Sequence, residues 1–73
     1  MTFNMDQEQL VWISKNVNIF IRNTKAEQLK RDYVYHLYNL ITGENKKPNG
    51  CGSCWRNVKN RVYQEYQKQT NIY

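Results

Sequence analysis

The sequence predicts an all-α fold: one small three-helix domain over residues 1–73, with helices at about 6–22, 25–42 and 52–69. In each of these segments apolar residues recur every three or four positions, the spacing that places them on one helix face. Polar or turn-rich stretches separate the segments. One Pro and three Gly in 73 residues are too few for a linker or low-complexity chain.

The first predicted helix covers about residues 6–22. Its apolar positions at helical spacing are Leu10, Ile13, Val17 and then either Phe20 or Ile21. Either Asn4 or Asp6 can serve as N-cap, with Gln7 or Gln9 three residues later to complete a capping box. The alternation over residues 17–21 also fits a short strand. Because no second segment offers a strand to pair with it, we favour a helix.

The second predicted helix covers about residues 25–42. Thr24 and Glu27 have the spacing of a capping box, and Gly43 supplies the stop signal. Tyr35 and Tyr38 lie off the expected core stripe, so we assign them to a protein interface, where aromatic side chains are enriched. The residues of the expected core stripe are Ala26, Leu29, Tyr33, Leu37 and either Leu40 or Ile41.

A loop and the third helix complete the predicted fold. Residues 44–50 contain Pro, Gly, two Asn and two Lys, which is typical of an exposed turn-rich loop. The third helix, about residues 52–69, has a narrow core stripe of about 80° on a helical wheel. That stripe consists of Trp55, Val58, Val62 and Tyr66.

The charge is unevenly distributed along the chain. The formal net charge is +5, yet residues 1–44 carry five basic and five acidic side chains, so the whole excess lies in residues 45–73. This asymmetry predicts an acidic partner, either nucleic acid or an acidic protein face. A solvated basic face that only keeps the domain soluble is the competing interpretation. The predicted contact residues are Lys46, Lys47, Arg56, Lys59, Arg61 and Lys68, and the predicted protein-interface residues are Trp12, Tyr35, Tyr38 and Tyr63.

Several function classes are not expected. The longest apolar runs, residues 10–13 and 19–21, are far shorter than the roughly 20 residues of a membrane span. Residues 1–6 lack the basic and apolar regions of a secretory signal, so we expect an intracellular protein. His36 is the single histidine, and it has no partner set typical of general-base catalysis. We therefore expect neither an enzyme nor a cofactor.

Cys51 and Cys54 form a C-x-x-C motif at the start of the third helix, and three interpretations of it remain open. The favoured one is a pair of small, reduced thiols that allow tight packing of the loop. Thiol–disulfide chemistry is a second, although redox C-x-x-C motifs normally lie in a βαβ setting. The third is zinc held by Cys51 and Cys54 of two copies in a dimer, because one chain lacks the four ligands that structural zinc needs.

The stretch from Leu40 to Val58, LITGENKKPNGCGSCWRNV, resembles a family of small helical proteins from tailed phages that infect Bacteroides-type hosts, the crAss-like group included. The resemblance covers about 20 residues and implies a phage protein. Our leading hypothesis is an accessory structural protein of the virion that binds a larger capsid or portal/tail protein. The alternatives are a nucleic-acid-binding regulatory protein and an inhibitor of a host defence enzyme. We expect it in the virion or the host cytoplasm, and a homo-oligomer is compatible with these roles.

Overall fold

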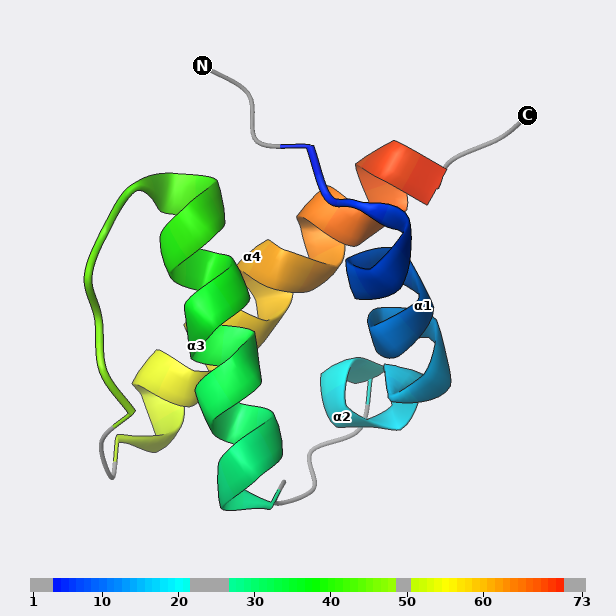
Figure 1. Ribbon diagram of the computed structural model, residues 1–73. Helices are drawn as coiled ribbons and strands as arrows, with labels where there is room; N and C mark the ends of the chain where they lie inside the picture. Colours follow the sequence, from blue (N-terminus) through cyan, green and yellow to red (C-terminus); the bar gives the residue numbers. More distant parts are fainter. Residues whose placement is uncertain (1–3, 22–26, 49–50, 71–73) are drawn as a thin grey trace.

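The computed structural model describes residues 4–21, 27–48 and 51–70, and these ranges contain four α-helices and no strand. In chain order the helices are α1 (Gln7–Lys15), α2 (Val17–Ile21), α3 (Gln28–Thr42) and α4 (Gly52–Thr70) (Figure 1). The all-α class is therefore confirmed. The prediction of three helices is wrong in one respect, because the first predicted helix is divided into α1 and α2.

Asn16 is the residue that separates α1 from α2. Its backbone N–H is shared between the carbonyls of Trp12 and Ile13, both at 3.1 Å, and its side-chain amide donates to the Trp12 carbonyl at 2.9 Å. Asparagine side chains compete in this way for backbone groups that a continuing helix would use. The predicted capping box at the other end of α1 is confirmed, with Asp6 as N-cap and Gln9 as its reciprocal partner.

Helix α4 is the central element of the fold. It packs against α1, α2 and α3, most extensively against α3. Figure 1 shows α3 and the α1–α2 pair lying side by side in front of α4. The predicted α4 stripe is confirmed: Val58 and Val62 are fully buried, and Trp55 and Tyr66 pack against the core at its edge. The buried apolar core consists of Met5, Ile13, Ile19, Phe20, Val34, Tyr35, Leu37, Tyr38, Val58 and Val62.

Helix α3 differs most from its prediction. It begins at Gln28 with Glu27 as N-cap, and Glu27 makes no side-chain capping hydrogen bond. The predicted start at residue 25 is therefore three residues early, and Thr24 and Ala26 lie outside the described residues. The predicted core stripe is correct in part: Leu37 is fully buried, and Tyr33 and Ile41 pack against the core, but Leu29 is 81% exposed and Leu40 is 41% exposed. The face that packs inward carries Val34, Tyr35, Leu37 and Tyr38.

A hydrogen-bonded chain ties the N-terminal segment to the last turns of α4. Arg61 Nη1 donates to Glu65 Oε2 at 3.2 Å, and Gln69 Nε2 donates to Glu65 Oε1 at 3.3 Å. Gln69 Oε1 in turn accepts from the backbone N–H of Met5 at 2.7 Å. Since Glu65 is only 6% exposed, these donors compensate the desolvation of its carboxylate. Met5 and α4 are thereby held together across 64 residues of sequence.

Gly43 ends α3 as the sequence predicts, with a left-handed backbone of φ 75°. A Cβ at this position would meet no atom within 4 Å, so backbone strain is the whole cost of a side chain. We expect Gly43→Ala to lower the free energy of unfolding by about 1 kcal/mol. Gly52→Ala is the matched control, because its Cβ also meets nothing and its φ is not positive. Urea unfolding of both variants measures the difference in their free energies of unfolding. Equal stability of the two variants would contradict the predicted cost at Gly43.

Candidate acidic-partner interface

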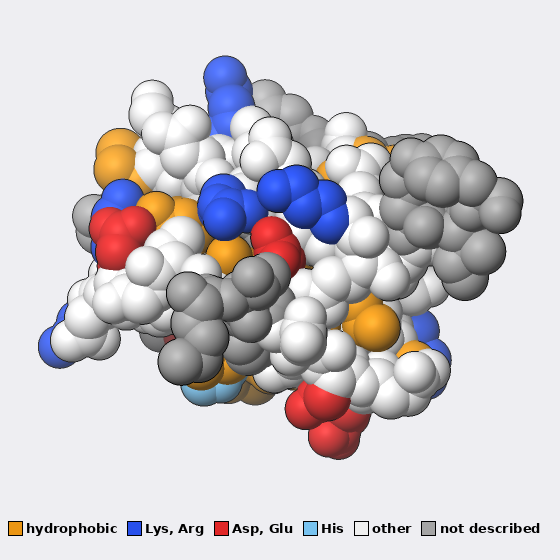
Figure 2. Space-filling view, turned by 90° about the horizontal axis from the view of Figure 1, so that it is seen from above, with side chains coloured by type: hydrophobic (Ala, Val, Ile, Leu, Met, Phe, Trp, Pro, Cys, Tyr) orange, Lys and Arg blue, Asp and Glu red, His pale blue; other side chains and the backbone are white. Residues whose placement is uncertain are grey.

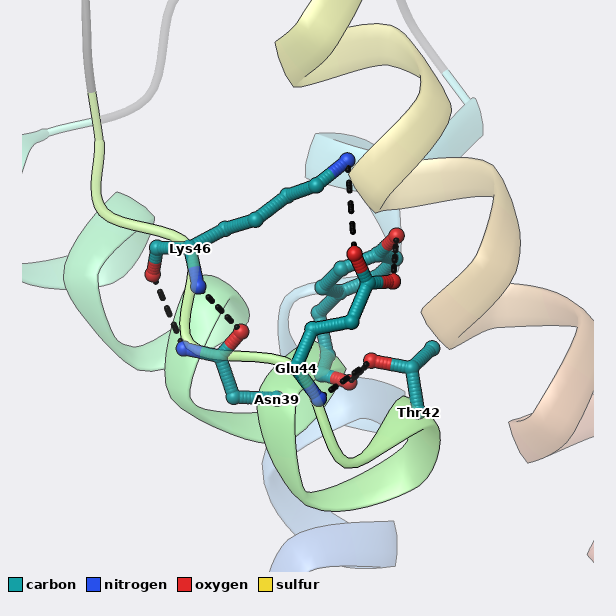
Figure 3. A network of polar contacts seen from close by, with 5 residues as sticks. Asn39, Thr42, Glu44 and Lys46 are labelled. Atoms are coloured by element: carbon teal, nitrogen blue, oxygen red, sulfur yellow. Dashed lines mark hydrogen bonds and ion pairs between the residues drawn. The ribbon is translucent and has the colours of Figure 1, made fainter.

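The loop that follows α3 is held against that helix by a polar network (Figure 3). Asn39 makes two hydrogen bonds with the backbone of Lys46, each of 2.9 Å. Glu44 accepts from the Tyr38 hydroxyl at 2.8 Å and pairs with Lys46 Nζ at 3.9 Å. The Lys46 ammonium also lies 5.3 Å from the centre of the Tyr38 ring. Lys46 is exposed, but its charge is already partly balanced within the loop.

Lys59 does not lie on the surface, so its assignment as a contact residue is wrong. The residue is 4% exposed, and its ammonium lies 5.4 Å from the centre of the Trp55 ring. Burial lowers the pKa of the Lys59 ammonium, and the neighbouring positive charge of Arg56 lowers it further. Lys59 faces inward because it lies one helical turn from Trp55 and Val62, on the edge of the face that α4 turns to the core.

Arg61 lies at the border between the core and the solvent. Its side chain is 39% exposed and forms an i,i+4 ion pair of 3.2 Å with the buried Glu65 carboxylate. The pair has no net charge, so Arg61 adds little to the long-range positive field of α4. Its remaining guanidinium N–H groups are still able to donate hydrogen bonds.

Between Arg56 and Lys68 one side of α4 is uncovered, and in this range it carries six exposed polar side chains. We call these residues the α4 open face: Arg56, Asn57, Asn60, Gln64, Gln67 and Lys68. They span about 18 Å along the helix and an arc of about 120° around it, opposite the buried Val58 and Val62. Arg56 and Lys68 take part in none of the ion pairs between described residues. The open face therefore has two available cations and four carboxamides.

The exposed carboxylates of the protein lie elsewhere. Glu65 is the one acidic residue of α4, and it is buried. Figure 2 shows basic side chains near the centre and at the upper edge of this view, with one acidic side chain directly beside the central ones and others at the left and lower edges. The exposed acidic residues are Asp6, Glu8, Glu27, Asp32 and Glu44, on the segments around α1 and α3. The net charge of +5 is thus partitioned in space as well as in sequence.

The four residues assigned to a protein interface lie mostly inside the fold. Tyr35 and Tyr38 are 3% and 9% exposed, so the prediction that they lie outside the core is wrong. Tyr35 stacks on Trp55 with ring centres 6.0 Å apart. Half-buried Trp12 packs on Phe20 and Tyr33, and half-buried Tyr63 stacks on Phe20 and Tyr66. These rings join the helices to one another, because their large apolar surfaces are what a chain this small has available for a core.

Cys51 and Cys54 form a disulfide, with Cα atoms 5.3 Å apart, which corrects the expectation of reduced thiols. The Cys54 backbone N–H also donates to the Cys51 sulfur at 3.1 Å. In this state neither residue has a thiolate to offer a metal ion. The cross-link closes the first turn of α4. In the part of the chain that the structure describes, no group of three or more His, Cys, Asp or Glu side chains is arranged to hold a metal ion.

Two further results concern the class of protein. Within the described ranges no helix has both the length and the apolar character needed to cross a membrane. No protein-family model, curated protein or solved structure matches this chain. The function is therefore inferred from the surface itself.

Four residues of the α4 open face were not predicted as site residues: Asn57, Asn60, Gln64 and Gln67. The predicted contacts were chosen by charge, and carboxamide side chains have none. The signal was nevertheless present: on a helical wheel they lie opposite the Val58 and Val62 stripe, between Arg56 and Lys68, with no Asp or Glu among them.

Proposed function

We propose that this chain is a small, non-catalytic accessory protein of a phage particle that binds an acidic partner through the α4 open face. The observation that carries the proposal is the absence of carboxylates from that exposed face, which leaves Arg56 and Lys68 unbalanced there. The resemblance of residues 40–58 to phage proteins supports the setting. Charge complementarity supports the acidic partner.

The chemistry of this surface favours a polar contact over an apolar one. Trp12, Tyr35, Tyr38 and Tyr63 pack within the fold, so they no longer argue for an aromatic interface. The α4 open face consists of Arg, Lys, Asn and Gln side chains, which make hydrogen bonds and ion pairs at hydrated interfaces. We therefore assign partner binding to α4 alone.

Mass spectrometry of purified particles tests the proposal. We expect the wild-type protein at fixed stoichiometry, and loss of incorporation on Arg56→Glu combined with Lys68→Glu, because the face would then repel an acidic partner. Lys15→Glu is a matched control for Lys68→Glu, since both lysines are exposed in the last turn of a helix. Absence of the wild-type protein from particles would refute the proposed setting, and normal incorporation of the double variant would refute the proposed face.

A further inference from the structure

We propose that the acidic partner is double-stranded DNA and that the α4 open face enters its major groove. This inference rests on the proposed function, and it names the partner of the same surface. In this arrangement Arg56 and Lys68 contact phosphates on the two sides of the groove, while the carboxamides of Asn57, Asn60 and Gln64 contact base edges.

The chemistry of the face is the first argument. A carboxamide offers a donor and an acceptor side by side, which is the pattern that pairs with N6 and N7 of adenine in the major groove. The carboxylates of an acidic protein surface only accept hydrogen bonds, so they can pair with the N–H groups of these amides but not with the amide oxygens. A helix face that serves solubility alone usually mixes acidic and basic side chains, and this one has no acidic member. Duplex DNA is the acidic partner that uses both kinds of side chain.

The order of side chains around the helix is the second argument. On the wheel Arg56 lies at one edge of the open face and Lys68 at the other, about 120° apart. Asn57, Asn60 and Gln64 lie between these edges, at positions i, i+3 and i+7. A helix in the major groove has phosphates along both flanks and base edges in front of its centre. Cations at the edges and amides at the centre match that arrangement.

Access to the face is the third argument. An α-helix with its side chains is about 10–12 Å across, and the major groove of B-DNA is about 12 Å wide. The other helices pack on the opposite side of α4, and in Figure 1 they lie together in front of it. All six side chains of the open face are exposed. The buried Val58 and Val62 hold α4 in place from the other side, so the helix that carries the face is already formed before it binds.

Fluorescence anisotropy with three probes tests the choice of partner: a mixed-sequence DNA duplex of about 20 base pairs, an RNA duplex of the same sequence, and poly-L-glutamate. We expect binding to the DNA to weaken between about 50 and about 200 mM salt, with a log–log slope of about 2 from Arg56 and Lys68. Arg56→Ala and Lys68→Ala should each reduce this slope by about 1, and Lys15→Ala should leave it unchanged. The RNA duplex should bind at least about tenfold more weakly, since its major groove is too narrow for a helix.

Selection of preferred sequences from a random duplex pool tests groove reading. We expect Asn60→Ala to remove the preference at one or two base pairs, with a loss of roughly 5- to 150-fold for the preferred site and an unchanged salt slope. Asn18→Ala is the control, because Asn18 is an exposed asparagine on α2, away from the open face. Far-UV circular dichroism verifies that each variant is folded.

The outcomes separate the two proposals. Binding of poly-L-glutamate but not DNA through Arg56 and Lys68 would overturn the DNA inference and leave the proposed function standing. DNA binding with no base preference, or with equal affinity for the RNA duplex, would overturn entry into the major groove. DNA binding that is unaffected by Arg56→Ala and Lys68→Ala would overturn the assignment of the α4 open face.

Discussion

Replacing Leu37 with alanine should lower the free energy of unfolding by about 3 kcal/mol. Leu37 is fully buried where α3 packs against α4, and the truncation leaves a cavity there. A domain of this length has a total stability of about 4–11 kcal/mol, so this loss is a large part of it. Urea unfolding followed by far-UV circular dichroism measures the effect.

Leu29→Ala is the matched control for Leu37→Ala. Both leucines lie on α3, and the sequence pattern assigns both to the core, but Leu29 is 81% exposed. Its truncation should change the free energy of unfolding by less than about 0.5 kcal/mol. Comparable losses for the two variants would mean that the face carrying Leu29 is buried after all, and would contradict the packing of α3 described above.

Phe20→Ala should cost about 3 kcal/mol, because its buried ring joins three parts of the fold. The residue is 7% exposed, and its ring lies 6.4 Å from that of Trp12 and 5.7 Å from that of Tyr63, centre to centre. Thermal and urea unfolding measure the loss. Truncation of Phe20 removes the contact through which the short helix α2 is held to α1 and α4.

Ile21→Ala is the control for Phe20→Ala, since Ile21 is the next residue of the same helix and is 58% exposed. We expect a change of less than about 0.5 kcal/mol. The sequence left Phe20 and Ile21 as equal candidates for the core, so this pair tests the choice that the fold makes between them. A larger loss for Ile21→Ala than for Phe20→Ala would contradict the position of α2.

Features that depend on a few neighbouring residues were predictable from the sequence. The capping box of Asp6 and Gln9 and the left-handed stop at Gly43 are as expected, because each is fixed by local hydrogen bonding or backbone sterics. The division at Asn16 was missed. There the apolar period continues through the break, since Ile13 and Phe20 both reach the core although the helix between them is interrupted.

The sequence predicted only part of the buried face of α3: Leu37 is in the core as expected, and Leu29 is not. The helix has two apolar faces that share Leu37, one with Leu29 and Leu40 and the other with Val34 and Tyr38. Helical periodicity describes each face equally well. The packing of α3 against α4 buries the face with Val34 and Tyr38. Tyr35 and Tyr38, which were predicted to lie on the surface, are therefore part of the core.

By itself the sequence determined the helical class, the position of α4 and the concentration of positive charge after residue 44. These properties follow from periodicity and composition. Only the tertiary structure decided which cations remain available: it buries Lys59 beside Trp55, pairs Arg61 with Glu65 and leaves Arg56 and Lys68 on the α4 open face. The physical reason is that a charge acts on a partner according to its burial and its neighbours, and helices distant in sequence set both.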